Sequence, residues 1–168
     1  MEIDVRNEEI KDIEQVREIV RAAFSTAAES KLVDALRANG KAVISLVAVD
    51  GDRVLGHIMF SPVSTTPPNN AKGIGLAPVA VHPDFQSRGV GSQLIHEGLR
   101  CCKELSYDYC VVLGNPKYYQ RFGFQKASSF GAKNEYGVDD AFMLIHFDQQ
   151  IALDALIRYV PEFSMFSL

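Results

Sequence analysis

The feature that most constrains the fold of this sequence is a predicted strand, helix and strand in immediate succession. Residues 75–81 form an apolar run that predicts the first strand, and a turn containing Gly89 and Gly91 follows it. Residues 91–105 then predict a helix, because their apolar side chains recur at the helical period of about 3.6. The almost wholly apolar run Tyr109–Leu113 predicts a strand buried on both faces. Since these elements form a β-α-β unit, the two strands are expected to be parallel neighbours.

Other elements are predicted on both sides of this unit. Ser25 and Thr26 offer an N-cap for a second helix that ends at Asn39 and Gly40, and Asp50-Gly51 is typical of a hairpin turn. The remaining predicted elements are a first helix at 8–24, strands at 42–49 and 53–60, a loop at 65–70, one or two helical turns at 118–122, and a strand at 141–147. The last twenty residues suit either a helix from Ile151 or an edge strand at 155–160.

Composition narrows the class of protein. A length of 168 residues with 47% hydrophobic side chains suits a single compact domain over residues 1–168. The formal charge of −4 excludes a nucleic-acid binder held by overall positive charge. The apolar runs are shorter than the roughly 18 residues of a membrane-spanning helix. Residues 2–5 lack the basic and apolar segments of a secretory signal, so we expect a cytoplasmic protein that binds no membrane and no nucleic acid.

The three cysteines give no sign of a metal or disulfide site. Cys101, Cys102 and Cys110 are odd in number and lack the paired C-x-x-C spacing of zinc and redox sites. Their predicted positions, on a helix and in a buried strand, favour packing over a reactive thiol, which needs exposure and a nearby cation. We therefore expect reduced thiols and no bound metal.

The turn between the first strand and its helix is the strongest candidate for a ligand site. Gly89 and Gly91 lack a Cβ, so the backbone can approach a ligand closely, and the N–H groups at the start of the following helix favour an anion. Such a turn suits a diphosphate, although the glycines could also serve only to shape the turn. Known nucleotide motifs do not fit, because Leu94 stands where a dinucleotide fingerprint needs its third glycine and no Gly-Lys-Ser/Thr follows.

The pattern Gln86-x-x-Gly89-x-Gly91 resembles the acetyl-coenzyme A signature of the GCN5-related N-acetyltransferases, the GNAT superfamily. Residues 76–81, 113–124 and 158–163 extend the resemblance to its YhbS-like branch and to nearly the whole chain. The resemblance implies an α/β fold with a mixed, mostly antiparallel sheet of about six to seven strands and flanking helices. The sheet is expected to splay between the fourth and fifth strands, 75–81 and 109–113, and residues 155–160 are expected to be a strand.

The resemblance also implies acetyl-coenzyme A (acetyl-CoA) as the acyl donor, bound without a metal. Backbone amides from Arg88 to Ser92 are expected to hold the diphosphate, and main-chain groups of Val79 and Val81 to hold pantetheine. The residues that correspond to the family's cofactor site are Val79, Ala80, Val81, Gln86, Ser87, Arg88, Gly89, Val90, Gly91, Ser92, Asn115 and Tyr118.

Acyl transfer to an amine needs a neutral nucleophile, donors for the oxyanion and a proton for the leaving thiolate. In the family the acid is a tyrosine four residues before the Gly of Gly-Phe, which corresponds to Tyr119. A phenol, with a pKa of about 10, suits the role because protonation of the thiolate is then not far uphill. Tyr118 competes for this role, but neighbours on a helical turn diverge by about 100°, so only one of the two should face the site.

The base is less clearly indicated by the sequence. Glu29 resembles an acidic residue of the YhbS-like branch and is a candidate base, with a solvated helical carboxylate as the alternative. His57 has a suitable unperturbed pKa but lies mid-strand, where a core imidazole is expected, and His82 precedes Pro83 at a turn. A chain of water molecules could replace a single base.

Together these features predict an acetyl-CoA-dependent N-acetyltransferase that uses direct transfer in a ternary complex. The alternative is a non-catalytic acyl-CoA-binding or sensing module on the same fold; a nucleotide-binding regulatory domain would need ribose and base contacts that the sequence does not indicate. The acceptor amine is not specified, because acceptor residues lie in loops that vary freely on a shared fold. A monomer or homodimer is expected.

Overall fold

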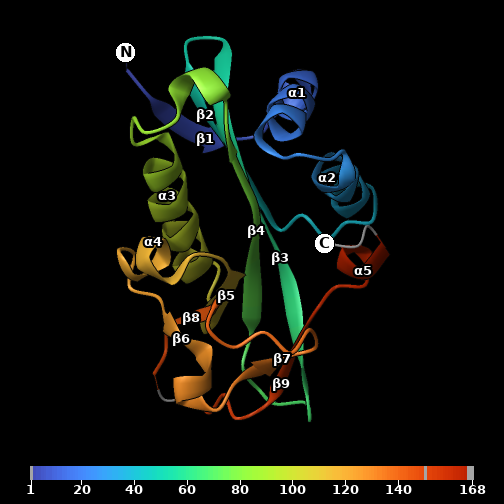
Figure 1. Ribbon diagram of the computed structural model, residues 1–168, viewed down its shortest axis with the longest axis vertical. Helices are drawn as coiled ribbons and strands as arrows, with labels where there is room; N and C mark the ends of the chain where they lie inside the picture. Colours follow the sequence, from blue (N-terminus) through green and yellow to red (C-terminus); the bar gives the residue numbers. More distant parts are fainter. Residues whose placement is uncertain (1, 150, 166–168) are drawn as a thin grey trace. The chain divides into compact units, whose positions relative to one another are not determined.

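The computed structural model describes residues 2–149 and 151–165 of the chain (Figure 1). The α-helices described in this part are α1 (Ile13–Ala23), α2 (Ala28–Ala38), α3 (Val90–Glu104), α4 (Pro116–Gln120) and α5 (Glu162–Met165). The 3-10 helices are η1 (Ile10–Asp12), η2 (Pro83–Phe85) and η3 (Ala127–Phe130). The strands are β1 (Asp4–Asn7), β2 (Ile44–Asp50), β3 (Arg53–Thr66), β4 (Gly73–Val81), β5 (Tyr109–Leu113), β6 (Gln125–Lys126), β7 (Lys133–Asn134), β8 (Phe142–His146) and β9 (Leu156–Tyr159).

The strands form one mixed, mostly antiparallel sheet, as the resemblance implies. Its order is β1-β2-β3-β4-β5-β8-β6, and β9 pairs with both β3 and β7. The parallel pairs among the described strands are β4 with β5 and β7 with β9. The nine described strands exceed the expected six to seven, because β6 and β7 have two residues each and leave no detectable sequence pattern.

The chain divides into two compact units. The first contains residues up to Ser61, Ala77–Gly98 and the segment from Pro161, and the second contains Pro62–Leu76 and Leu99–Val160. Strands β3 and β4 and helix α3 run through both units. The single domain expected from the sequence stays a prediction.

The first unit is built around β2, the first part of β3 and the last part of β4. Within it, α3 lies on the opposite side of β3 and β4 from α1 and α2 (Figure 1). The apolar face of α1 packs on the sheet through a cluster formed by Val16, Ile19, Val20, Val47, Val49, Val54 and Ala80. On the other side, a Cβ at Gly56 would lie only 3.0 Å from side-chain atoms of Val90 and Leu94, so the glycine allows α3 to approach the sheet.

The second unit contains the predicted central strand. In β5, Tyr109–Val112 are buried as expected, whereas Leu113 is 39% exposed. The β4–β5 ladder joins Gly73–Gly75 to Tyr109–Val111 and ends there, although both strands continue beyond it. We call the end of this ladder, at Gly75 and Val111, the fork. Such an early end is what the expected splay between these two strands requires, and Pro78, which has no N–H to donate, follows in β4.

Two local predictions were wrong. Residues 65 and 66 are not loop but the end of β3, because Val63–Thr66 pair with Leu156–Tyr159 of β9. This pairing also settles the ambiguous C-terminal segment as a strand. The N-cap of α2 is Ala27 rather than Ser25 or Thr26, although the Thr26 hydroxyl still accepts the N–H of Ala28 at 3.2 Å. Within the described residues, no helix is both long and apolar enough to cross a membrane.

Candidate active site

The turn after β4 is stabilised by hydrogen bonds of the His82 and Gln86 side chains. His82 is the N-cap of η2, and its Nδ1 accepts the N–H of Asp84 at 3.1 Å, so this histidine serves the turn as expected. Gln86 Nε2 donates to the carbonyl oxygen of Val81 at 3.3 Å and so fastens the turn to the end of β4. The signature glutamine therefore has a structural task.

The backbone of this turn takes conformations that favour glycine. Ser87 has φ 62° and Gly89 has φ 83°, and a Cβ at Gly89 would meet no atom within 4 Å. The backbone angle, rather than crowding, is thus what favours glycine at position 89. The helical bond from Gln93 N–H to Gly89 C=O is 3.1 Å long. The N–H groups of Val90 and Gly91 precede this bond at the start of α3, where helical N–H groups have no intrahelical acceptor and favour an anion.

Two guanidinium groups lie beside this turn. The Phe85 ring has Arg53 at 4.6 Å and Arg88 at 5.6 Å from its centroid, and the His82 ring lies edge-on at 5.5 Å. These cation–π contacts hold two positive charges against Phe85, in the segment that precedes α3. Arg53 was missed from the sequence, because it begins a strand 35 positions before Arg88 and only the fold brings both to one ring.

The other predicted residues of the first unit divide by exposure. Ala80 is buried in the α1 cluster, whereas Val79 and Val81 are half-buried, as strand alternation requires. Glu29 is half-buried in the first turn of α2, where the Thr26 hydroxyl donates to Oε2 at 3.3 Å. A carboxylate in a first helical turn is favoured by the helix dipole, so this contact suits a local capping role as well as a base.

Asn115 and the two tyrosines belong to the second unit. Asn115 is the N-cap of α4, with Oδ1 accepting the N–H of Lys117 at 3.0 Å and Pro116 at the first helical position. The carbonyl oxygen of Asn115 also accepts the N–H of Tyr119 at 3.1 Å. The asparagine therefore fixes the short helix that carries both tyrosines.

The two tyrosines differ in exposure. Tyr119 is 7% exposed and its ring covers the α-carbon of Gly114, where a Cβ would collide with it. Tyr118 is half-buried, with its ring 5.1 Å from that of Tyr119 at an interplanar angle of 86° and 5.3 Å from that of Phe122. The guanidinium of Arg121 lies 5.1 Å from the Tyr118 ring.

Burial makes Tyr119 a weaker acid than the sequence suggests. Loss of hydration, and then the nearby Tyr118 and Cys110, raise the pKa of Tyr119 to about 12. Its hydroxyl therefore stays protonated at physiological pH. Transfer of that proton to a thiolate with a pKa near 8.5 would cost about 5 kcal/mol if the phenolate gained no stabilisation. The transfer is therefore further uphill than the ordinary pKa of a phenol indicates.

His57 belongs to a buried network rather than to an accessible site. Its ring is fully buried, and Nε2 lies 2.9 Å from Ser45 Oγ and 3.1 Å from Glu8 Oε2. Arg37 donates two hydrogen bonds to the same carboxylate, of 2.7 and 2.8 Å. Burial, which outweighs the hydrogen bond to Glu8, lowers the pKa of His57. A neutral core imidazole, as the sequence favoured, accounts for these contacts.

The cysteines are free thiols, as expected. Cys102 and Cys110 are buried and Cys101 is half-buried. Burial raises the pKa of Cys110 well above its usual value, so this thiol stays protonated and is a poor nucleophile. Within the described part of the chain, no group of three or more His, Cys, Asp or Glu side chains could hold a metal ion.

Comparison with known proteins assigns the chain to a family. A family profile described as an acetyltransferase (GNAT) domain matches residues 4–127, well over half of the sequence. The chain belongs to the GNAT acetyltransferase family.

Individual GNAT proteins support the assignment. The uncharacterized N-acetyltransferase YhbS of Escherichia coli K12 is 34% identical over 152 residues, which cover 88% of this chain and 90% of that protein. A crystal structure of E. coli YhbS in complex with CoA has a TM-score of 0.92 at 31% identity, covering 99% of this chain and 94% of that one. A GNAT family acetyltransferase from Brucella melitensis in complex with acetyl-CoA has a TM-score of 0.82 at 34% identity, covering 96% and 98%.

The predicted site residues of this GNAT chain fall into two groups, one in each unit. The first unit holds the turn and its neighbours, namely Glu29, Val79, Ala80, Val81, Gln86, Ser87, Arg88, Gly89, Val90, Gly91 and Ser92. The second unit holds Asn115, Tyr118 and Tyr119. Within each unit the residues lie on one turn or on consecutive elements, except for Glu29 on α2.

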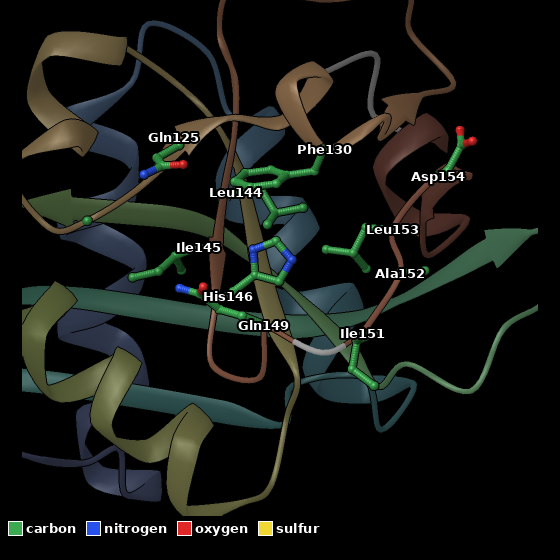
Figure 2. Close-up of a pocket in the computed structure, with 11 residues that line it drawn as sticks. Gln125, Phe130, Leu144, Ile145, His146, Gln149, Ile151, Ala152, Leu153 and Asp154 are labelled. Carbon is green, nitrogen blue, oxygen red and sulfur yellow. The ribbon is translucent and has the colours of Figure 1, made fainter.

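A cavity of about 420 Å³ in the second unit contains none of the predicted residues. It is lined by Gly123, Gln125, Phe130, Leu144, Ile145, His146, Gln149, Ile151, Ala152, Leu153 and Asp154. Figure 2 shows the His146 imidazole pointing into it below the Phe130 ring, and the two ring centroids are 4.5 Å apart. Burial lowers the pKa of His146, which favours the neutral imidazole.

Proposed function

We propose that this GNAT protein is an acetyl-CoA-dependent N-acetyltransferase that transfers the acetyl group directly to an amine in a ternary complex. The observation that carries the proposal is the turn from Gln86 to Ser92, which leads into the N-terminus of a 15-residue helix and has two guanidinium groups beside it. An anion is favoured there by both the helix N-terminus and the nearby positive charge. The binding of CoA by E. coli YhbS and of acetyl-CoA by the Brucella protein supports the same ligand class.

In this proposal the backbone amides from Arg88 to Ser92 receive the diphosphate, with Gln86, Ser87 and Gly89 shaping the turn. Main-chain groups of Val79, Ala80 and Val81 are proposed to pair with pantetheine. Arg53 is added as a positioning residue, because it shares the Phe85 ring with Arg88. Asn115 is proposed to act through α4, as the cap that orients the helix bearing Tyr118 and Tyr119.

In the proposed reaction the amine loses one proton and the leaving thiolate gains one. The neutral amine nitrogen attacks the thioester carbonyl carbon, a C–N bond forms and the C–S bond breaks. The amine loses a proton to Glu29 or to water, and the departing thiolate receives one. We propose Tyr119 as the donor, which gives up its proton as the C–S bond breaks and is then reprotonated from water; its raised pKa sets the energetic cost of this step.

One observation also supports a second function. The pKa of about 12 makes Tyr119 a weak proton donor, which suits a module that binds acyl-CoA without turning it over. We retain this non-catalytic module as the alternative. A cytoplasmic location and a monomeric or homodimeric state also remain proposals.

The test is release of CoA thiol from acetyl-CoA in the presence and absence of a panel of primary amines. An acetyltransferase should release thiol in proportion to an acetylated amine product detected by mass spectrometry. Binding of acetyl-CoA by calorimetry with no product from any amine would favour the non-catalytic module. Absence of acetyl-CoA binding by the folded protein would contradict both functions.

A further inference from the structure

The cavity of about 420 Å³ in the second unit lies where β8 extends past its short partner β6. The ladder between these strands joins Gln125–Lys126 to Met143–Leu144, whereas β8 continues to His146. Before β6 the chain passes close to β8 at Gly123, where a Cβ would lie 3.2 Å from Ile145 Cδ1. Because β6 is so short, Ile145 and His146 line the cavity rather than continue the ladder.

A second wall of the cavity is held in place by the fold. It consists of Ile151–Asp154, which lead towards β9, and of Phe130 at the end of η3. The N–H of Lys133 donates to the carbonyl oxygen of Ala155 at 3.0 Å, and this bond joins the two segments just after the residues that line the cavity. The cavity is therefore formed before any ligand binds, as in most small-molecule sites.

The apolar side chains of the cavity suit an aromatic ring. Leu144 and Leu153 are buried and Phe130 is half-buried. The Phe130 ring stands edge-on to the His146 imidazole, with the ring centroids 4.5 Å apart and an interplanar angle of 80°. Aromatic rings prefer such edge-on contacts, and the volume of the cavity lies in the range of about 300–1,000 Å³ that is usual for small-molecule sites. A further ring can therefore pack beside Phe130.

Three polar side chains that line the cavity have unused hydrogen-bonding groups. Gln125, His146 and Gln149 make no hydrogen bond to another group within residues 2–149 and 151–165, and Figure 2 shows all three around the cavity. Burial lowers the pKa of His146, and the neutral imidazole that this favours has one donor and one acceptor. Each glutamine amide also has both kinds of group. These side chains match a ligand that carries a donor and an acceptor side by side, as a carboxamide does.

The charges around the cavity disfavour an anion. Among the described residues that line it, Asp154 is charged and none is a lysine or an arginine. Asp148 adds a second negative charge close enough to oppose the effect of burial on the pKa of His146. A bound anion would therefore meet two carboxylates and no cation. The Asp154 carboxylate points away from His146 (Figure 2), so the polar groups that face a ligand beside the imidazole are uncharged.

We propose that this cavity is a second ligand site, which binds a small uncharged aromatic or heteroaromatic carboxamide. The ring of the ligand packs on Phe130 and the two buried leucines. Its amide N–H and C=O groups pair with the side chains of His146 and Gln149, because a polar group that leaves water needs a new hydrogen-bond partner. None of the residues proposed for acyl transfer lines the cavity, so the inference does not rest on the proposed function.

The experiment compares three molecules that share a pyridine ring and differ in charge. At pH 7 nicotinamide is an uncharged amide, nicotinate is the matching anion and 3-(aminomethyl)pyridine is the matching cation. Binding is measured by calorimetry and by the NMR signals of the His146 imidazole protons. Nicotinamide should bind with a dissociation constant on the order of 1 mM, as expected for so small a ligand. Nicotinate should bind at least about tenfold more weakly, because its carboxylate is repelled by those of the protein.

Two variants test the polar contacts. His146→Phe keeps a ring beside Phe130 but has neither donor nor acceptor, and Gln149→Ala removes the amide. Each should weaken nicotinamide binding by roughly three- to tenfold, which is the usual effect of one lost hydrogen bond. The matched control is Asn70→Ala, which removes an exposed amide elsewhere in the second unit and should bind nicotinamide like the wild type.

Unchanged nicotinamide affinity in both cavity variants would overturn the inference. So would nicotinate or the cation binding as tightly as nicotinamide, or no binding of nicotinamide at several times the expected dissociation constant. Nicotinamide binding in a protein that acetylates no amine would leave the inference standing and contradict the proposed catalysis. Acetylation without nicotinamide binding would contradict this site alone.

Discussion

The imidazole Nε2 of His57 lies 3.1 Å from the Glu8 carboxylate, which joins the middle of β3 to the residue that follows β1. Ser45 also donates to Glu8 Oε2, at 3.0 Å, and Arg37 from α2 completes the network. Although burial alone raises the pKa of Glu8, hydrogen bonds from His57 and Arg37 lower it to about 2. The network therefore stabilises the first unit only while Glu8 is ionised.

Low pH should destabilise the protein through Glu8 and His57. The folded pKa of Glu8, about 2, lies below the ordinary value of 4.5, so its contribution is complete above pH 4.5 and is lost as the pH falls toward 2. The lowered pKa of His57 also reduces stability as the pH falls below 6.5. The reason is that the imidazole is protonated at a higher pH in the unfolded chain than in the folded protein. For Glu8, a pKa shift of this size corresponds to a contribution of roughly 3 kcal/mol to the free energy of unfolding.

Denaturant unfolding of the wild type and Glu8→Gln from pH 7 to pH 3 measures this effect. The variant should be less stable at pH 7, and its stability should fall less between pH 4.5 and pH 3. Glu14→Gln, at a side chain that is 79% exposed, is the control and should follow the wild type. Parallel stability curves for the wild type and Glu8→Gln would show that the network does not set the acid sensitivity.

Substitutions in the glycine turn should weaken cofactor binding while the protein remains folded. Gly89→Ala places a side chain at φ 83° and Gly91→Val adds bulk to the first turn of α3, where backbone N–H groups are proposed to meet phosphate. We expect affinity for acetyl-CoA to fall by at least about tenfold.

Gly40→Ala is the matched control for backbone strain. Gly40 has φ 70°, and a Cβ added there would meet no atom within 4 Å, as at Gly89, but it follows α2 and has no proposed contact with the cofactor. Calorimetry should show normal affinity for this variant and a similar loss of thermal stability. Unchanged affinity in Gly91→Val would remove the turn from the cofactor site.

Tyr119 rather than Tyr118 should support turnover. Replacement of either tyrosine by phenylalanine keeps the ring and its packing and removes one hydroxyl. Because general acids commonly contribute 10²–10⁴-fold and a thiolate is a fair leaving group, Tyr119→Phe should lower kcat by roughly 10–100-fold. Tyr118→Phe should lose less under the same conditions.

Rates should be measured from pH 6 to pH 10 with saturating acetyl-CoA. Since the pKa of Tyr119 is about 12, its ionisation should leave no inflection in this range. A wild-type rate in Tyr119→Phe together with a collapse in Tyr118→Phe would move the acid to Tyr118.

The cysteines should form no acetyl-enzyme. Cys110 is buried with a raised pKa, so its thiolate is scarce, and Cys102 is also buried. Incubation with isotopically labelled acetyl-CoA and no amine, followed by intact-mass analysis, should show only the unmodified chain. Initial-rate lines should intersect, as in a ternary mechanism, and a stoichiometric adduct on any cysteine would require a thiol intermediate instead.

Local patterns in the sequence were sufficient for the β-α-β unit. Tyr109–Leu113 was predicted with its observed bounds, and the helix predicted at 91–105 begins and ends one residue earlier, at Val90 and Glu104. Runs of this kind are visible because a strand buried on both faces and an amphipathic helix each impose a period on adjacent residues. The motif Gln86-x-x-Gly89-x-Gly91 likewise lies on consecutive residues and directed attention to the turn.

The short strands and the charge environment were decided by tertiary contacts. β3 extends to Thr66 because β9 pairs with it from about 90 positions away, and no local pattern signals that partner. The contact of Arg53 with Phe85 likewise joins residues that are far apart in the sequence.

The sequence alone thus determined the order of the main elements and the GNAT signature. It also gave the register that makes Tyr119, rather than Tyr118, the candidate acid. Only the tertiary structure decided the pKa values of Tyr119, His57 and Glu8, because a pKa depends on hydration and on charges from distant segments. Burial, followed by the electrostatic effect of Tyr118 and Cys110, makes Tyr119 a weak acid, and burial likewise keeps His57 neutral beside an ionised Glu8.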